Sequence, residues 1–284
     1  MLLLALGMLL PVVTEAAPGA DTLRSASELD YPPFALVDAD GHAAGFAVDL
    51  LRATVAGIGR RVRFEVGPWA ELKEALADGR LDVLPLVGRT PEREALFDFS
   101  APIVTVTGVV AVRDDGPAPG TLADLHDLEV AVMAGDVVDE YAWRHDVAGR
   151  LVRSRSYGDA LRDLSVGRFD AVLAPAPVAR HLIADLRLSN VRIAPVTLPD
   201  LQQSYCFAVH KGDTRLLADL DRGLAALHAN GTFDRISARW LGHGRRYERL
   251  LPWLLAGLAL AAMLVVALRL RRPDAGPGAG RGAA

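Results

Sequence analysis

Short strand-like runs and helical patterns alternate along residues 21–250, and this alternation restricts the fold more than any other feature of the sequence. Runs of strand length, rich in apolar and β-branched residues, occupy 61–66, 81–87, 103–112, 128–134, 169–174, 191–196 and 205–209. Apolar residues at helical spacing lie between them, over 46–59, 68–76, 157–164, 213–230 and 232–240. Strands that alternate with helices over this length predict an α/β fold with largely parallel sheets. We expect Pro85 to end the pairing of its strand, because proline has no N–H to donate.

Two uncharged apolar segments flank this pattern. Residues 2–13 are too few to span a bilayer and small residues follow them, so residues 1–20 are predicted to be a secretory signal peptide, although no Lys or Arg precedes the apolar run. Residues 251–268 would rise about 27 Å as a helix, close to the thickness of the hydrocarbon core of a bilayer. They predict a single transmembrane helix, with a buried core helix as the alternative.

The order of these segments predicts a single-pass protein of the inner membrane. The globular part, residues 21–242, would stand in the periplasm, and residues 243–250 would form a juxtamembrane linker. Residues 269–284 are rich in Gly, Pro and Ala and predict a short disordered cytoplasmic tail. We expect any signal from such a chain to pass to another protein, because no output domain follows the membrane helix.

Charge and residue usage argue against several classes of protein. The formal net charge of −4 argues against a nucleic-acid binder, which usually carries a basic field. The single cysteine, Cys206, allows neither an intrachain disulfide nor a zinc site made of cysteines. The seven histidines are scattered and form no metal-binding pattern, and no nucleophile elbow or phosphate loop is present. We therefore expect no metal and no cofactor.

Several short motifs occur in a fixed order along the globular part. They are Tyr-Pro-Pro-Phe at 31–34, Gly-Arg-Leu-Asp at 79–82, Thr-Pro-Glu-Arg at 90–93, Met-Ala-Gly at 133–135, Gly-Arg-Phe-Asp at 167–170 and Arg-Trp-Leu-Gly at 239–242. Each motif is weak alone, but their order and spacing resemble the family 3 bacterial solute-binding proteins from about Leu23 to Gly242. Members of that family are two-lobed clamshells related to receptors for polar amino acids.

The resemblance implies a particular division of the chain. It implies a two-lobed periplasmic-binding-protein fold, a type II clamshell, followed here by the single transmembrane helix. Lobe 1 would comprise about 22–112 and 204–242, and lobe 2 about 113–203. Two hinge segments, near 110–114 and 200–205, would join the lobes.

Arg93 is the first candidate for ligand binding. In similar receptors the arginine of this Thr-x-x-Arg segment binds the ligand carboxylate, and a guanidinium offers two parallel donors that match a carboxylate. The alternative is an ion pair within the lobe, with Glu92 or Asp98. Gly88 and Arg89, just before this segment, are further candidates by resemblance.

Aromatic residues and one strand-to-helix turn complete the predicted site. The resemblance places Tyr31 and Trp69 on loops that face the cleft, where their rings could sandwich a ligand, whereas Phe34 could equally belong to the core. Gly135 and Asp136 end a strand and open a helix, where free backbone N–H groups can hold an anion. Asp136 could instead be a plain N-cap, or it could face the ligand and favour a cationic group.

Two departures from the amino-acid receptors bear on the ligand. Those receptors carry an acidic residue just after the strand at 169–174, where it pairs with the ligand ammonium, but residues 174–177 here read Ala-Pro-Ala-Pro. Leu86 and Gly88 also stand where the receptors often have hydroxyl groups. We therefore expect a small carboxylate or a mixed polar and aromatic ligand rather than a standard amino acid.

The sequence as a whole predicts a membrane-tethered solute-binding protein and not an enzyme. It would close on a small polar, carboxylate-bearing ligand, either to signal to a histidine kinase or cyclase partner or to serve transport. One alternative is the substrate receptor of an ABC-type importer, with a permease as its partner. The other is a clamshell dehydratase that acts on a small cyclic carboxylate, with Arg93 holding the substrate and Asp136 or Glu140 as the acid.

Overall fold

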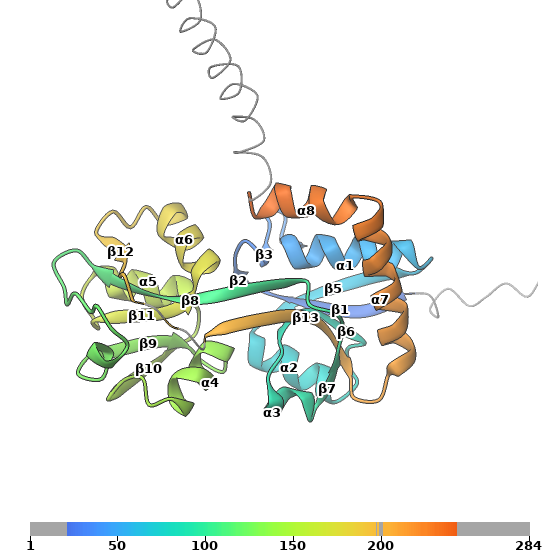
Figure 1. The fold of residues 1–284 in the computed structure, drawn as a ribbon. Coiled ribbons are helices and arrows are strands. Elements are labelled where there is room, and N and C mark those ends of the chain that lie inside the picture. The colour runs from blue at the N-terminus through green and yellow to red at the C-terminus, as the bar shows by residue number, and fades with distance from the viewer. Residues whose placement is uncertain (1–21, 197, 199–200, 243–284) are drawn as a thin grey trace, which may run out of the picture.

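The computed structural model describes residues 22–196, 198 and 201–242. Two α/β lobes lie side by side and are joined by two long strands (Figure 1). The predicted signal peptide, transmembrane helix and tail lie outside the described residues. Among the residues that are described, no helix is both long enough and apolar enough to cross a membrane.

Lobe 1 is a sheet with helices on both faces. Its strands are β1 (Thr22–Glu28), β5 (Arg61–Gly67), β6 (Val83–Gly88), β7 (Phe97–Phe99) and β13 (Gln202–His210), and its helices are α1 (Phe46–Gly57), α2 (Trp69–Ala77), α3 (Pro91–Glu94), α7 (Thr214–Ala229) and α8 (Thr232–Trp240). Helices α1, α7 and α8 pack on one another above the sheet, and α2 packs below it on β1, β6 and β13 (Figure 1). A small antiparallel sheet of β2 (Asp30–Tyr31), β3 (Ala35–Val37) and β4 (Ala43–Ala44) lies beside β1.

Lobe 2 repeats the same plan on a smaller scale. Its strands are β9 (Glu129–Met133), β10 (Arg150–Ser154), β11 (Ala171–Pro175) and β12 (Val191–Ile193), and its helices are α4 (Val137–Arg144), α5 (Tyr157–Ser165) and α6 (Ala176–Asp185), with a short 3₁₀ turn, η1 (Ala123–Leu125). Strands β9, β10 and β11 are parallel to one another. Helices α5 and α6 pack together against the sheet.

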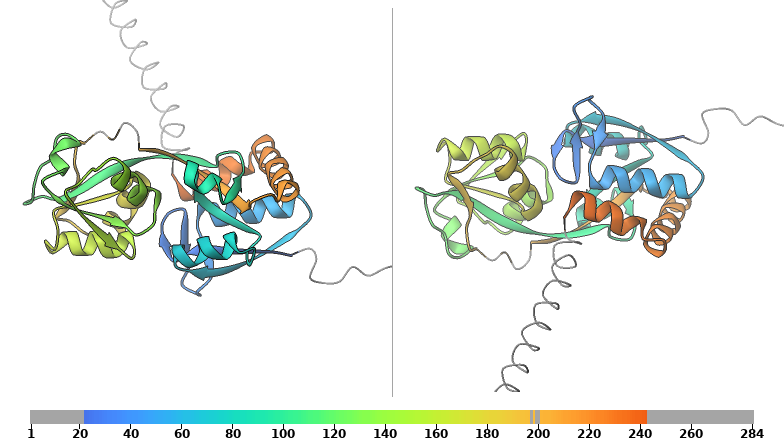
Figure 2. Two further views of the ribbon diagram at one scale, coloured as in Figure 1. Left: turned by 90° about the horizontal axis from the view of Figure 1, so that it is seen from below. Right: turned by 90° about the horizontal axis from the view of Figure 1, so that it is seen from above.

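Strand β8 (Val104–Arg113) links the lobes, and β13 lies beside it (Figure 2). The first part of β8, up to Thr107, pairs with β13, whereas Gly108 to Arg113 pairs with β11 and β12 of lobe 2. The chain therefore enters lobe 2 a few residues before the predicted boundary at 112. The crossing is crowded, because a Cβ on Gly108 would lie 2.1 Å from Cδ2 of Leu201.

The alternation of strands and helices predicted from the sequence is observed, with several corrections. Strands β1 and β10 and helix α3 lie outside the predicted runs, and antiparallel strand pairs outnumber the parallel pairs that were expected to dominate. Strand β6 continues through Pro85, but its pairing with β13 is disturbed there. Leu84 pairs with Ala208 and Val87 with Cys206, which leaves Pro85 and Leu86 of β6 opposite a single residue of β13. Helix α6 was not predicted, because its first turn contains Pro177. Proline is tolerated there, since first-turn N–H groups have no partner within the helix.

Candidate functional site

The predicted site residues that come together do so where the two lobes meet. Lobe 1 contributes side chains from β2 and from the starts of α2 and α3. Lobe 2 contributes the turn after β9, the first turns of α4 and the start of α5. In open α/β sheets, ligands bind at the carboxyl ends of the parallel strands, and the β9–α4 turn lies at such an end.

Arg93 is buried between the lobes, with only 4% of its side chain exposed. Thr90 caps α3 by accepting the Arg93 N–H, which fixes the start of this short helix. The guanidinium lies 5.0 Å from the centre of the Trp69 ring. Its Nε and Nη2 donate to Oε1 of Glu140 at 3.2 and 2.8 Å, and Nη2 also donates to the Gly135 carbonyl at 3.1 Å.

The ion pair of Arg93 therefore joins the two lobes and is not the intra-lobe pair considered from the sequence. Glu92 instead pairs with Arg144 of lobe 2 at 2.7 Å, and Asp98 pairs with Lys211 at 2.7 Å. The guanidinium also donates to the Gly88 carbonyl at 3.3 Å, which ties it to the end of β6.

Asp136 is a buried carboxylate that both caps α4 and faces lobe 1. Its Oδ1 accepts the Val137 N–H at 2.6 Å, as an N-cap does. Its Oδ2 accepts from the hydroxyl of Tyr157 at 2.5 Å and from that of Tyr31, across the cleft, at 3.3 Å. Burial raises the pKa of Asp136, although the Tyr157 hydrogen bond and the charge of Arg93 act in the opposite direction. The hydroxyls of Tyr31 and Tyr205 share a hydrogen bond of 2.6 Å.

Glu28 is a second carboxylate at this place, and the sequence did not point to it. Its pKa is raised to about 8, chiefly by burial and also by the negative charge of Asp136, against the opposing charge of Arg93. Glu28 ends β1, a strand whose sequence has few apolar residues and which was not among the predicted runs. The sequence signal that could have identified Glu28 is its position three residues before Tyr31, a predicted site residue. Tyr157 and Tyr205 were predicted only as parts of a helix and a strand.

Trp69 and two glycines show how closely the lobes approach. Trp69 Nε1 donates to the Gly135 carbonyl of lobe 2 at 2.9 Å. A Cβ on Gly88 would lie 2.4 Å from Cγ1 of Val137, and one on Gly158 would lie 2.5 Å from Oδ2 of Asp30. Each of these contacts joins one lobe to the other, so the clamshell is closed.

Two other predicted site residues do not lie at the lobe boundary. Phe34 is fully buried in lobe 1 and stacks on Tyr205, with ring centres 6.3 Å apart, so the core interpretation applies. Arg89 has 49% of its side chain exposed, and it pairs with Glu94 at 2.5 Å and lies over Phe99. It takes no part in the contacts between the lobes.

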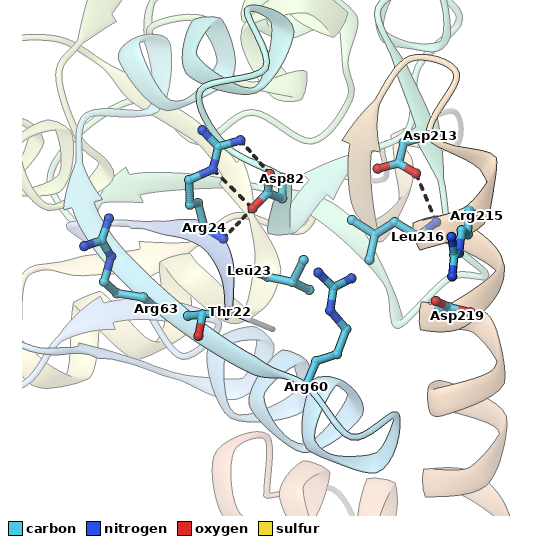
Figure 3. A pocket seen from close by; sticks show the side chains of 10 residues that line it. All are labelled: Thr22, Leu23, Arg24, Arg60, Arg63, Asp82, Asp213, Arg215, Leu216 and Asp219. Atoms are coloured by element: carbon cyan, nitrogen blue, oxygen red, sulfur yellow. Dashed lines mark hydrogen bonds and ion pairs between the residues drawn. The ribbon is translucent and has the colours of Figure 1, made fainter. Parts of the chain in front are cut away.

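The cleft and the far end of lobe 1 each contain a cavity. The cleft cavity measures about 460 Å³ and is lined by both lobes, including Glu28, Trp69 and Asp159. A larger hollow of about 840 Å³ opens at the start of β1, where Arg24 forms an ion pair with Asp82 (Figure 3). All of its lining belongs to lobe 1, so closure of the lobes does not form it.

One group of side chains has the composition of a metal site. Asp38, Asp40 and His42 bring their ligand atoms within 4.8 Å of one another, and all three are exposed. Asp38 already accepts the backbone N–H groups of Asp40 and His42, which accounts for the grouping as a turn.

Comparisons with known proteins agree with this architecture. The family model of bacterial extracellular solute-binding proteins, family 3, matches residues 23–243. The chain is 30% identical to the L-cystine-binding protein TcyJ of Escherichia coli K12, over 78% of this chain and 83% of that protein. It is 28% identical to ABC transporter arginine-binding protein 1 of the same organism, over 84% and 98%.

A solved structure of a histidine kinase sensor domain with similarity to periplasmic binding proteins is also close. It superposes with a TM-score of 0.74 at 33% identity, covering 78% of this chain and 96% of that one. The resemblance seen in the ordered motifs is thereby confirmed, and the fold is the two-lobed α/β fold of periplasmic binding proteins. The chain is a member of the bacterial extracellular solute-binding proteins, family 3.

Proposed function

We propose that this protein is a periplasmic receptor whose lobes close on a small carboxylate-bearing ligand, and that residues 251–268 tether it to the inner membrane. One observation carries the proposal. A nearly buried guanidinium, that of Arg93, lies at the lobe boundary on the face of Trp69 and already holds a carboxylate, that of Glu140. A ligand carboxylate would take the place of Glu140.

The charges around Arg93 narrow the ligand class. Asp136 and Glu140 lie beside the Arg93 guanidinium, Glu28 holds its proton near neutral pH, and Asp30 and Asp159 line the adjoining cavity together with Arg155. An excess of carboxylates favours a ligand that carries positive charge as well as its own carboxylate. The named relatives bind cystine and arginine, so amino acids replace other small carboxylates as the first class to test. The ligand amine would then contact these carboxylates rather than residues 174–177.

Two roles are consistent with such a receptor. Similarity to an ABC transporter arginine-binding protein supports delivery of the ligand to a permease. Similarity to a histidine kinase sensor domain supports signalling to a partner kinase or cyclase. The proposed tether favours signalling, since an anchored domain stays beside one membrane partner. Deleting the gene's predicted anchor would abolish a signalling response and leave uptake of the ligand intact.

The test is a ligand screen by thermal unfolding, with two arginine variants. L-arginine, L-histidine, L-cystine and small organic acids are added to the parent protein, to Arg93→Ala and to the control Arg89→Ala. A ligand at 100 times its Kd adds about 2.7 kcal/mol, which raises the Tm of a domain of this size by roughly 5–10 °C. We expect the rise in the parent and in Arg89→Ala, and its loss in Arg93→Ala. Equal binding by Arg93→Ala would refute the carboxylate assignment, and conversion of a cyclic acid during the screen would favour the dehydratase alternative.

A further inference from the structure

The contacts of lobe 1 with helix α4 share one face of that helix. Asp136, Glu140 and Arg144 follow one another at intervals of four residues, which places them in line along the helix. Each contacts a different group of lobe 1, since Asp136 accepts from Tyr31, Glu140 pairs with Arg93 and Arg144 pairs with Glu92. We call these three residues the α4 latch.

We infer that the α4 latch closes the clamshell in the absence of ligand, and that Glu140 sets the ligand affinity by competing for Arg93. The inference that Glu140 competes with a ligand for Arg93 rests on the proposed function. The inference that the latch closes the lobes does not, because all of its contacts are between residues of the protein itself.

Competition follows from the donors of Arg93. Glu140 Oε1 accepts from both Nε and Nη2, which form the edge of the guanidinium that a carboxylate normally binds. The remaining terminal nitrogen, Nη1, donates to the Gly88 carbonyl. A ligand carboxylate can therefore reach this edge only after Glu140 has left it.

The Glu140 contact is built so that it can be displaced. Both donors converge on Oε1, while Oε2 is buried and has no hydrogen-bond partner among the described residues. In a bidentate pair, both carboxylate oxygens accept a hydrogen bond from the guanidinium. The Glu140 contact lacks the second bond, and a buried acceptor without a partner costs free energy. Glu140 also keeps 27% of its side chain exposed, so a turn about its side-chain bonds would bring the carboxylate into water.

The other two members of the latch hold the lobes together less firmly than Glu140 does. Asp136 is buried, but its short bonds to Tyr157 and the Val137 N–H lie within lobe 2, and its bond to Tyr31 of lobe 1 is 3.3 Å long. The Arg144–Glu92 pair has 44% and 59% of its side chains exposed, and exposed pairs contribute little. Ligand entry therefore depends on Glu140, and the fraction of protein in which Glu140 has left Arg93 scales the apparent affinity.

Closure is tested without ligand by measuring the distance between two spin labels. Labels at Glu74→Cys on α2 and Val166→Cys after α5 report on the two lobes, and buried Cys206 is not labelled. In the full chain we expect one narrow distance distribution. Glu140→Ala, and Glu140→Gln should the first variant fold poorly, should add a second, longer population. The control Glu94→Gln removes an exposed carboxylate that pairs within lobe 1, and it should change nothing. An unchanged distribution in the Glu140 variant that folds would overturn the proposed role of the latch in closure.

Competition is tested by titration calorimetry with L-arginine, L-histidine and L-cystine. Glu140→Gln should bind whichever of these binds the parent about tenfold more tightly, which corresponds to a gain of about 1.4 kcal/mol. Glu94→Gln should bind it as the parent does. Binding that needs Arg93 yet is unchanged or weaker in Glu140→Gln refutes the competition and leaves the proposed function standing. Should none of the three bind, the proposed ligand class fails, and the spin-label distances still decide whether the latch exists.

Discussion

Raising the pH is expected to destabilise the native protein because of one carboxyl group, Glu28. Burial between the lobes raises the pKa of Glu28 from its ordinary value of 4.5 to about 8. Between about pH 4.5 and pH 8, Glu28 keeps its proton in the native state and releases it in the unfolded state. The free energy of unfolding therefore falls as the pH rises, because stability increases with pH only where the unfolded state binds more protons.

The size of the loss follows from the shift. One pKa unit corresponds to about 1.36 kcal/mol, so the loss relative to pH 4.5 is about 3 kcal/mol at pH 7 and approaches about 4 kcal/mol above pH 8. The stabilisation by protonated Glu28 is fully present below the pKa of the group in the unfolded state, and it is lost as the pH rises through the pKa of the native state. Asp136 and Asp30, whose pKa values burial also raises, change stability in the same direction. Asp82 and Asp98, whose pKa values are lowered, lose their contribution only in more acidic solution.

Urea unfolding near pH 5, 7 and 9 measures this effect. Glu28→Gln keeps the shape of the side chain and cannot ionise, so its stability should fall much less between pH 5 and 9 than that of the parent. Glu65→Gln is the matched control, since Glu65 lies on the neighbouring strand β5 with 64% of its side chain exposed. That variant should follow the parent. If Glu28→Gln loses as much stability as the parent between pH 5 and 9, ionisation of Glu28 is not the source of the loss.

Two further outcomes are expected from the packing. Gly88→Ala places a Cβ 2.4 Å from Val137 Cγ1 and should push the ligand-free lobes apart. Adding Val137→Ala should restore the spin-label distance of the closed protein. A Gly88→Ala protein that keeps the closed distance would contradict this account. Burial raises the pKa of the Cys206 thiol to about 11. An aromatic disulfide reagent near pH 8 should therefore modify Cys206 only after urea unfolding, because the thiolate is the reactive form. Rapid modification of the native protein would show that β13 opens locally.

The fold could be predicted because the strands and helices of this chain differ in their spacing of apolar residues. Helix α1 shows the signal well, because Phe46 and Leu50, and likewise Leu51 and Val55, are buried four residues apart on one face of the helix. Where tertiary structure overrides the local signal, the prediction fails. Strand β1 has few apolar residues and is held by its pairing with β5, and α6 begins with a proline that a first turn accommodates.

The candidate site could be predicted only in outline, for a similar reason. Arg93 and Tyr31 lie in motifs whose order the sequence displays, Asp136 directly follows another of these motifs, and Trp69 was placed on the cleft by the resemblance; the structure brings the four together. The contact of Arg93 with Glu140 depends on the approach of two lobes, which no local pattern encodes. Glu140 was considered only as an acid in the dehydratase alternative. Arg89, one residue beyond β6, lies on the surface, because consecutive residues of extended chain point in opposite directions.

The paired strands at the lobe boundary have a consequence for how accurately the clamshell can close. Residues 104–107 of β8 and 202–205 of β13 are held in register by backbone hydrogen bonds. A slip of one residue would turn every side chain to the opposite face, so the ribbon can bend and twist but cannot slide. Opening is then a rotation with a fixed axis, and each return brings the same atoms face to face. A side chain as short as that of Asp136 can therefore meet a hydroxyl on the other lobe at every closure.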